Sequence, residues 1–319
     1  MEKQMDFKPE QAGRILAEIE GLTLLYDAPM SQRTQFRAGG PADLLVMPRT
    51  LESLYSVKER CLEEGWPLTV LGRASNVLVS DRGIRGITLL LSPSLSFLER
   101  KGETLIAGAG VPLYRIAALA ARHSLTGFEF ASGIPGSAGG AVFMNAGAFD
   151  GNMAGVVTRT LYIGEDGRRG ELLGDAHDFG YRHSYYSDHP GALIAQVDIR
   201  LQEDDPLAIY DRMADVARRR YLSQPLALHS AGSAFRRPSG YFAGKLISDA
   251  GMKGYRRGQA GVSAKHAGFI VNHGGASASD ILQIFLDVRQ AVFDRDQVSL
   301  HPEVRLVGDW DVRPFDPED

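Results

Sequence analysis

A glycine-rich run near the middle of the chain is the feature that most constrains its fold. Residues 133–148 read GIPGSAGGAVFMNAGA, and six of these 16 residues are glycine or proline in an otherwise apolar setting. In such a run, backbone N–H groups can approach an anion without interference from Cβ atoms. The alternative is a tight connection between strands, which is the commoner role of paired glycines.

The run matches neither the Rossmann fingerprint nor the Walker motif. The residues alone therefore predict a phosphate-binding loop without identifying the nucleotide. The amide of Asn145 could address a ring system.

A second candidate loop, 72-GRASNVLVSD-81, follows the strand-like residues 68–71. Gly72, Ser75 and Asn76 could supply a turn and hydrogen-bond donors to a diphosphate, although the segment alone is an ordinary strand–turn–strand pattern. Two glycine-rich loops from different lobes suit an extended ligand with a central pyrophosphate better than a mononucleotide.

Composition excludes several classes of protein. The 319 residues are 44% hydrophobic and 23% charged, with a net charge of −4, so a disordered chain and a dedicated nucleic-acid binder are both disfavoured. The single cysteine, Cys61, excludes an intramolecular disulfide and any cysteine-rich metal site. No apolar run reaches membrane-spanning length and the polar start lacks the order of a secretory signal, so we expect a soluble, cytoplasmic protein.

The hydrophobic pattern predicts an α+β or α/β chain with two small sheet-containing lobes. Residues 1 to about 25 read as an appended helix, with apolar residues at helical spacing before Gly21. Short apolar runs that predict strands occupy 44–47, 68–71, 77–79, 87–91 and 105–107, and helical patterns cover 50–64 and 112–123.

Two longer helices are predicted in the last third of the chain. One covers 208–222, and the other follows Ser277, where Ser277 and Asp280 fit a capping-box-like start. The inward residues are predicted to be Ile209, Met213, Val216 and Ala217 in the first helix, and Ile281, Ile284, Phe285, Val288 and Val292 in the second.

Three further motifs carry candidate chemistry. In 181-YRHS-184, Arg182 is a fixed cation suited to a carboxylate or an enolate, although a surface arginine is the default reading. Ser233 in 231-AGSAFRRPSG-240 lies outside any G-x-S-x-G elbow, which disfavours an acyl-enzyme hydrolase. Glu303 precedes a short alternating strand and either points into a cleft or lies exposed at an edge.

Two charged clusters remain open to interpretation. From Arg212 to Arg257, ten cations face two acidic residues, which fits either an anionic ligand or a solvated basic helix face. The polar residues Asp175, His177, Asp178, His183, Asp188 and His189 lack standard metal-ligand spacings, so we interpret them as a polar loop and predict no metal site.

Taken in order, these segments resemble the UDP-N-acetylenolpyruvoylglucosamine reductases of peptidoglycan synthesis, the MurB family. The resemblance runs from about Thr34 to Gly308. It rests on 34-TQFRAGGPAD-43, 72-GRASNVLVSD-81, 133-GIPGSAGGAVFMNAGA-148, 181-YRHS-184, 232-GSAFRRP-238, 244-GKLI-247, 265-KHAGFIVN-272 and 301-HPEVRLVG-308.

The resemblance implies an α+β fold with a two-lobed FAD-binding domain of the vanillyl-alcohol-oxidase type and a C-terminal α+β substrate-binding domain. The expected boundaries are 1–25 for the helical extension, 26–95 and 96–206 for the two FAD-binding lobes, and 207–319 for the substrate domain. FAD would lie between the lobes with its pyrophosphate against Gly72–Asn76 and Gly136–Ala141. The cofactor contacts that the resemblance implies are Gly72, Arg73, Ala74, Ser75, Asn76, Val77, Gly136, Ser137, Gly139, Gly140, Ala141 and Asn145.

The family uses NADPH to reduce FAD and then reduces an enolpyruvyl ether on a UDP-sugar. On this resemblance Arg182 would stabilise the enolate, Ser233 would protonate C2 and Glu303 would help to polarise the enolate. Substrate contacts would come from Tyr181, Arg236, Arg237 and Lys245. We expect the three catalytic side chains to converge over one cavity, in a protein that works as a monomer and binds no nucleic acid or membrane.

Departures from the family pattern concern details of binding. Arg73-Ala74 stand where further glycines are common, and Arg236-Arg237 stand where Lys-Asn is common. Eight residues separate Ser184 from Leu193, which resembles the short-loop subclass.

Two other functions stay open: a flavin oxidase of the same fold, which would need a flavin-linking His or Cys, and a catalytically silent UDP-sugar sensor.

Overall fold

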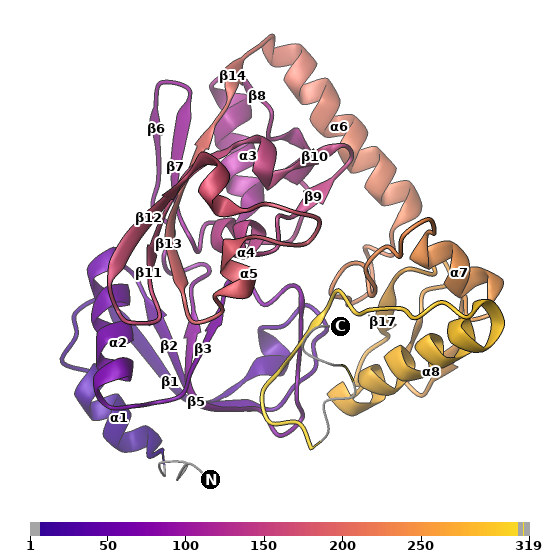
Figure 1. Ribbon diagram of the computed structural model, residues 1–319, viewed down its shortest axis with the longest axis horizontal. Helices are drawn as coiled ribbons and strands as arrows, with labels where there is room; N and C mark the ends of the chain where they lie inside the picture. The colour runs from indigo at the N-terminus through magenta and orange to yellow at the C-terminus, as the bar shows by residue number, and fades with distance from the viewer. Residues whose placement is uncertain (1–6, 312–314, 316–319) are drawn as a thin grey trace. The chain divides into compact units, whose positions relative to one another are not determined.

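The computed structural model of the protein describes residues 7–311 and 315, which divide into two units (Figure 1). Unit 1 combines the chain up to Tyr26 with Asp43–Arg73 and Gly86–Arg219. Unit 2 combines Asp27–Ala42, Ala74–Arg85 and the chain from Arg220 onward. Each unit therefore takes residues from distant parts of the sequence, and each has its own hydrophobic core.

The first sheet of unit 1 has the strand order β1-β2-β5-β3. β3 and β5 pair in parallel, from Leu68 opposite Ile87 to Leu71 opposite Leu90. A parallel pair needs a crossover, so the chain leaves β3 at Leu71 through the glycine-rich loop that begins at Gly72. The elements of this region are α1 (Pro9–Leu16), β1 (Leu22–Pro29), β2 (Pro41–Pro48), α2 (Leu51–Glu63), β3 (Leu68–Leu71) and β5 (Ile84–Leu90).

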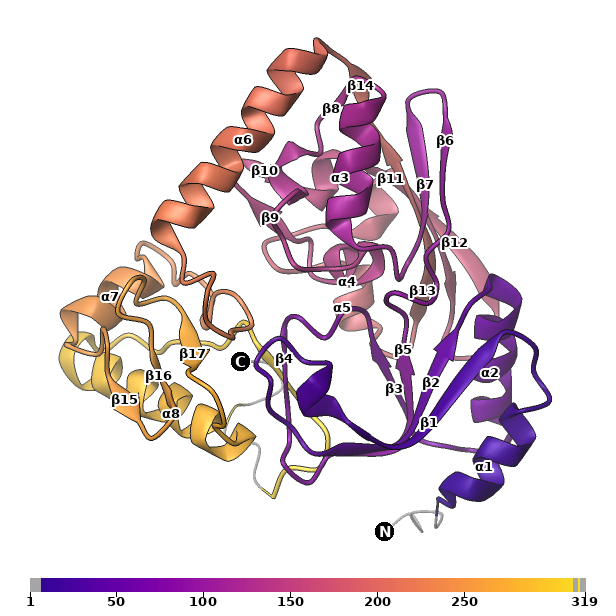
Figure 2. The same ribbon diagram turned by 180° about the vertical axis from the view of Figure 1, so that it is seen from behind.

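The second sheet of unit 1 is antiparallel, with the order β12-β11-β13-β7-β6. α3 and α4 pack on β7, and α4 also packs on β13 (Figure 2). The principal elements are β6 (Leu98–Lys101), β7 (Thr104–Gly108), α3 (Leu113–Arg122), α4 (Ala138–Phe143), β11 (Val157–Ile163), β12 (Arg169–Leu173), α5 (Tyr185–Asp188), β13 (Leu193–Arg200) and α6 (Pro206–Ser223). The short pairs are β8 (Leu125–Thr126) with β14 (Gln202–Glu203), and β9 (Gly147–Ala148) with β10 (Gly151–Asn152).

Unit 2 is built around a three-stranded antiparallel sheet against which α8 packs (Figure 1). Segments from early in the chain complete it, because β4 pairs in parallel with the C-terminal β18. Asn272 ties in another early segment, since its Nδ2 donates to the carbonyl of Phe36 at 2.8 Å. The elements are β4 (Val77–Val79), α7 (Ala243–Asp249), β15 (Arg256–Arg257), β16 (Ala260–Val262), β17 (Ile270–Asn272), α8 (Ala278–Asp296) and β18 (Arg305–Val307).

Short 3-10 turns connect several of these elements. They are η1 (Met30–Gln32), η2 (Glu129–Ala131), η3 (Met153–Gly155) and η4 (Gly174–His177). None of the helices in the described part of the chain combines the length and the hydropathy that a membrane crossing requires.

Most predicted elements are confirmed, with two corrections. The N-terminal helix is shorter than predicted: α1 ends at Leu16, Gly21 adopts φ 78°, and Leu22 begins β1, while residues 1–6 lie outside the described part. Ala217 is exposed rather than inward-facing, because α6 buries only a narrow stripe that includes Ile209 and Val216. The five inward residues predicted for α8 are all buried.

Candidate active site

Gly72, the unit 1 residue that begins the first glycine-rich loop, lies beside Ser137 of the second glycine-rich loop. A Cβ atom added to Gly72 would lie 2.3 Å from Ser137 Oγ and 3.7 Å from the backbone nitrogen of Gly140. A side chain at Gly72 would therefore displace the Ser137 hydroxyl from its present position. The structure thus places Gly72 of the first loop beside Ser137 of the second, and their shared role toward one ligand stays a prediction.

Ser137 is a buried serine at the start of α4 whose hydroxyl makes no capping hydrogen bond. It occupies the N-cap position of α4, where serine normally accepts a hydrogen bond from the first turn. Its side chain makes no such bond, and among the described residues its buried Oγ has no hydrogen-bond partner. A buried, unsatisfied hydroxyl is costly, so this atom marks a position where a polar ligand group fits.

Backbone hydrogen bonds fix the loop around Ser137. The carbonyl of Gly136 accepts from the N–H of Leu113 at 3.0 Å, and the N–H groups of Ala138 and Gly139 donate to the carbonyls of Val111 and Ala109, each at 2.9 Å. A Cβ on Gly139 would lie 2.8 Å from the Cβ of Ala109, so this close contact requires glycine. The loop is held in place by the segment between β7 and α3.

Asn145 uses its amide within the protein. Its Nδ2 donates to the carbonyl of Gly180 at 2.8 Å, and its Oδ1 accepts from the N–H of Ala154 at 3.0 Å. Asn145 itself is 8% exposed. The amide predicted to address a ring system therefore fastens the turn that carries Arg182.

Arg182 lies in a tight turn with an uncommon backbone conformation. Gly180 and His183 exchange backbone hydrogen bonds of 3.1 and 3.4 Å, and Arg182 between them adopts φ 55°. A positive φ is disfavoured for a residue with a long side chain, so neighbouring contacts must hold the turn. The guanidinium carbon lies 5.3 Å from the ring centroid of Tyr181, which is 61% exposed.

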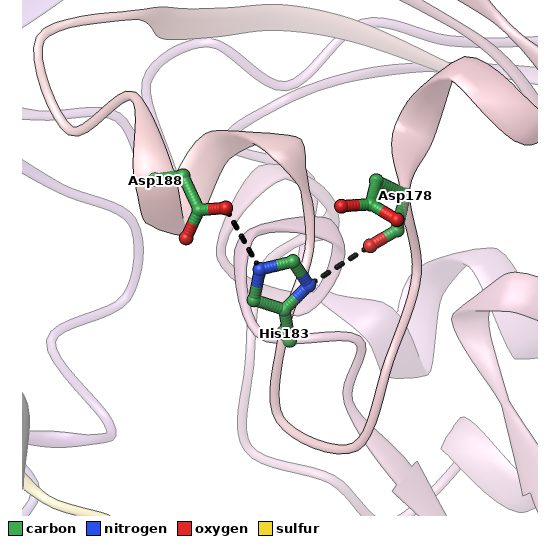
Figure 3. Close-up of side chains that lie close together, drawn as sticks. All are labelled: Asp178, His183 and Asp188. Atoms are coloured by element: carbon green, nitrogen blue, oxygen red, sulfur yellow. Dashed lines mark hydrogen bonds and ion pairs between the residues drawn. The ribbon is translucent and has the colours of Figure 1, made fainter.

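Three residues of the predicted polar loop surround this turn. A ring nitrogen of His183 and one carboxylate oxygen each of Asp178 and Asp188 lie within 4.8 Å of one another (Figure 3). His183 Nδ1 hydrogen bonds to the carbonyl of Asp178 at 2.9 Å, and Nε2 to the Asp188 carboxylate at 3.0 Å. The residues predicted as a polar loop are thus joined by hydrogen bonds, and we call Asp178, His183 and Asp188 the brace.

The other predicted residues of this cluster have separate positions. His177 is fully buried, hydrogen bonds to the carbonyl of Gly174 at 2.8 Å and lies 3.0 Å from Thr160 Oγ1. Burial lowers the pKa of His177, because desolvation disfavours the charged imidazolium. His177 therefore supports the fold beneath the turn.

Ser233 and Glu303 lie on neighbouring segments of unit 2. The N–H of Glu303 donates to the carbonyl of Ala234 at 2.8 Å, and Phe235 forms an isolated bridge with Pro302. Asn76 Nδ2 donates to the carbonyl of Glu303 at 2.9 Å. Three segments far apart in sequence are therefore joined here, and Asn76 has a structural contact besides its predicted role toward a cofactor.

The predicted substrate residues of unit 2 are exposed, and the side chains of Arg237 and Lys245 form contacts within the protein. Arg237 Nε donates to the carbonyl of Tyr241 at 3.2 Å and its guanidinium stacks 3.9 Å from the Phe242 ring centroid. Lys245 pairs with Asp249 at 2.5 Å. Arg236 is exposed, and its N–H donates to the carbonyl of His301 at 2.8 Å.

The local excess of cations is partly neutralised by acidic partners. Arg212 pairs with Glu129 at 3.0 Å and with Asp204 at 2.6 Å, while Arg218 and Arg219 both contact Asp215. These pairs support the solvated-helix interpretation for α6. Exposed pairs of this kind contribute about 0–1 kcal/mol each to stability.

Comparisons with known proteins address both parts of the chain. A family model described as "FAD binding domain" matches residues 42–169, and one described as "UDP-N-acetylenolpyruvoylglucosamine reductase, C-terminal domain" matches residues 224–307. A UDP-N-acetylenolpyruvoylglucosamine reductase of Clostridium perfringens (strain 13 / Type A) is 43% identical over 282 residues, which cover 88% of this chain and 92% of the relative. The chain belongs to the UDP-N-acetylenolpyruvoylglucosamine reductase (MurB) family.

Two further members of the MurB family agree with this assignment. The reductase of Pediococcus pentosaceus is 43% identical over 286 residues, covering 90% of this chain and 95% of the relative. The crystal structure of the MurB of Thermus caldophilus matches with a TM-score of 0.77 and 35% identity, and covers 90% of this chain and 98% of that one. The α+β fold with an FAD-binding domain and a C-terminal MurB domain is confirmed.

The residues around Gly72 and Ser137 fit the FAD that this family assignment implies. FAD carries a pyrophosphate, which accepts hydrogen bonds from hydroxyl and backbone N–H groups. Ser137 Oγ is buried without a partner among the described residues, and the contacts at Gly72 and Gly139 leave no room for a Cβ. The donor set and the small residues are those expected for a pyrophosphate-binding loop.

Cys61 is not placed to attach a flavin. It lies in the middle of α2, is 3% exposed, and burial raises the pKa of its thiol to about 12. Such a thiol is a poor nucleophile, because the thiolate is the reactive form. A covalent bond between Cys61 and the flavin, one of the two linkages expected of a flavin oxidase of this fold, is therefore disfavoured.

Sequence reasoning missed some residues that hold the site together. The Asp81 carboxylate accepts from the backbone N–H groups of Ala278 and Ser279, at 2.7 and 2.8 Å, at the start of α8. The capping pattern at Ser277 predicted that helix start but carried no signal for a carboxylate almost two hundred residues away. The brace around His183 was likewise visible only as a cluster of polar residue types.

Proposed function

We propose that the protein reduces UDP-N-acetylglucosamine enolpyruvate to UDP-N-acetylmuramate with NADPH and FAD, as a step of peptidoglycan precursor synthesis. The observation that carries the proposal is the meeting of Gly72 with Ser137, whose buried hydroxyl has no partner among the described residues. These two residues lie in a chain whose match covers 92% of the UDP-N-acetylenolpyruvoylglucosamine reductase of Clostridium perfringens. We propose Gly72, Arg73, Ala74, Ser75, Asn76, Val77, Gly136, Ser137, Gly139, Gly140, Ala141 and Asn145 as the residues that surround the cofactor.

FAD, held by the residues named above, would supply the two-electron chemistry by which a hydride equivalent from NADPH reaches C3 of the enolpyruvyl group. Hydride addition there breaks the carbon–carbon π bond and leaves negative charge at C2, delocalised onto the carboxylate as an enolate. The protein must stabilise this charge and then supply one proton at C2. Hydride and proton together account for the saturated lactyl ether.

Arg182 is proposed to stabilise the enolate. A guanidinium keeps its charge at every relevant pH and offers a rigid fork of donors that matches a carboxylate. Its turn is held by Asn145 and by His183, so the cation needs little reorganisation during the reaction.

Ser233 is proposed to donate the proton to C2, with Glu303 polarising the enolate or organising the proton path. A serine hydroxyl is a weak acid, so this step requires the strongly basic carbon of an enolate. The hydrogen bond between the Glu303 N–H and the Ala234 carbonyl keeps the two segments in register. We propose Tyr181, Arg236, Arg237 and Lys245 as contacts for the UDP-sugar.

Other features belong to the same proposal. We propose a cytoplasmic, monomeric enzyme. We also propose that it belongs to the short-loop subclass, because eight residues separate Ser184 from Leu193. The functional division is proposed as an N-terminal extension (1–25), two FAD-binding lobes (26–95 and 96–206) and a substrate domain (207–319).

The function is tested with the purified protein. We expect a yellow protein that releases FAD on denaturation and consumes NADPH only when the enolpyruvyl UDP-sugar is added, with UDP-N-acetylmuramate as the product identified by mass spectrometry. A protein that stays colourless after incubation with FAD, or NADPH consumption that does not depend on the sugar, would contradict the proposal.

A further inference from the structure

The turn that carries Arg182 lies in the sequence between two short elements, η4 and α5. The C-cap of η4 is Asp178, which has a left-handed conformation with φ 47°, and the last residue of α5 is Asp188. His183 lies between them, with its side chain 36% exposed (Figure 3). The imidazole is therefore the side chain that connects both ends of the segment 178–188.

The two partners of the imidazole set its protonation state. A backbone carbonyl oxygen has no hydrogen to donate, and neither has an ionised carboxylate. Both contacts of His183, to the Asp178 carbonyl and to the Asp188 carboxylate, can therefore be hydrogen bonds only if both ring nitrogens carry protons. A neutral imidazole would lose one of the two contacts.

We propose that His183, held as an imidazolium between the Asp178 carbonyl and the Asp188 carboxylate, is a positioning residue that keeps Arg182 in its positive-φ turn. His183 is the next residue in the chain and closes that turn through its backbone bonds to Gly180. This inference rests on the enolate-stabilising role proposed for Arg182. His183 itself touches no reacting atom in it.

The charged surroundings support a cationic ring. Asp188 from α5 and Asp178, which follows η4, lie close to the imidazole, and Arg182 and Tyr181 precede His183 in the turn. α4, whose last residue accepts a hydrogen bond from Ser184, contains no ionisable side chain. The hydrogen bond to Asp188 is the largest cause that raises the pKa of His183, and the Asp178 contacts act in the same direction.

The sign of the pH dependence follows from this shift. Because the pKa of His183 is raised in the folded protein, the brace is complete below the ordinary histidine pKa. It is lost as the pH rises through the folded value. The reaction of the reduced flavin with substrate should therefore slow on the alkaline side, while flavin reduction by NADPH should not follow the same titration.

The first test measures the brace without using activity. NMR titration of the His183 Hε1 signal should give a pKa above the ordinary value in the wild-type protein and a lower one in Asp188→Asn. The asparagine keeps an acceptor oxygen but removes the charge. Asp175→Asn, an exposed change on η4, is the matched control and should leave the titration unchanged. A wild-type pKa at or below the ordinary value, or one that Asp188→Asn does not lower, would overturn the brace.

The second test measures what the brace does for Arg182. His183→Ala should slow flavin reoxidation by substrate about tenfold, the size expected from a modest misplacement of a catalytic group, with flavin reduction nearly unchanged. His183→Arg, a cation that does not titrate in this range, should restore most of the rate and abolish its alkaline decline. Equal losses in both half-reactions, or no rescue by arginine, would assign His183 a merely structural role.

The two proposals fail in different ways. If the wild-type reduced flavin does not react with the enolpyruvyl UDP-sugar at all, the proposed function fails, and the NMR titration still decides whether the brace exists. If the sugar reacts normally but His183→Ala reacts as fast as wild type, the positioning role alone fails.

Discussion

Ser137 and Ser233 are two candidate site serines in opposite surroundings. Ser137 is 1% exposed, sits in a rigid glycine-rich loop, and its hydroxyl has no partner among the described residues. Ser233 is exposed and follows Gly232, which has φ 83°. A buried hydroxyl without a partner leaves a hydrogen-bonding group for a ligand atom to satisfy, whereas an exposed serine acquires a role only through the chemistry of its substrate.

The comparison predicts that changes near Ser137 act on flavin binding and that a change at Ser233 acts on the reaction. The strongest test is Gly72→Val, which forces side-chain atoms against Ser137 Oγ, because even a Cβ at Gly72 would lie only 2.3 Å from that oxygen. We expect the purified variant to be nearly colourless, with FAD affinity reduced at least about a hundredfold, a cost on the order of 3 kcal/mol.

The control for this variant is Gly155→Ala. A Cβ there would come no closer than 4.0 Å to Asn152 Oδ1, so the change should leave the flavin content at the wild-type level. A yellow Gly72→Val protein with normal FAD affinity would show that the two loops do not enclose the cofactor.

A smaller effect is expected from Ser137→Ala. Removing one hydrogen-bond donor to the cofactor should weaken FAD binding about fivefold to tenfold, which corresponds to roughly 1 kcal/mol. The flavin-free protein should be as stable as wild type or slightly more stable, because a buried unsatisfied hydroxyl has been removed. Fluorescence titration with FAD and urea unfolding of the apoprotein measure the two effects, and a loss of apoprotein stability without loss of FAD affinity would refute this assignment.

The smallest effect on flavin binding is expected from Ser233→Ala. This exposed side chain lies in unit 2, and its removal should change neither the FAD affinity nor the free energy of unfolding by more than about 0.5 kcal/mol. FAD titration of the variant beside wild type measures this. A clear loss of flavin would remove the distinction between the two serines.

The local parts of the fold were predictable because their signals are local. The capping box of Ser277 with Asp280 and the five buried residues of α8 follow from spacing along a single helix. The N-terminal helix was predicted too long, because propensity alone does not reveal that Leu22 begins a strand of the first sheet. The exposure of Ala217 had the same cause, since burial depends on what packs against α6.

The candidate site was predictable in its residue types but not in their contacts. Glycine-rich composition identified both loops, and the structure adds that Gly72 meets Ser137. The amide of Asn145 binds Gly180, and His183 bridges Asp178 and Asp188, although no spacing rule distinguishes these side chains from other loop residues. The contact of Asn145 with Gly180 depends on how separate segments fold together, and the two local contacts of His183 depend on the backbone conformation of the turn.

Convergence of the catalytic residues stays a prediction. Arg182 belongs to unit 1, whereas Ser233 and Glu303 belong to unit 2, where the Glu303 N–H bonds to the Ala234 carbonyl. Their joint action on one substrate is therefore a matter for kinetics.

Stopped-flow separation of the two half-reactions in Ser233→Ala tests the central claim most directly, with Ser239→Ala as the matched control on the same exposed segment. We predict that NADPH reduces the flavin of both variants at nearly the wild-type rate. Reoxidation of the reduced flavin by the enolpyruvyl UDP-sugar should be slowed at least about a hundredfold in Ser233→Ala alone, the contribution typical of a general acid. Reoxidation at the wild-type rate, or an equal loss in both half-reactions, would contradict the assignment of Ser233 as the proton donor.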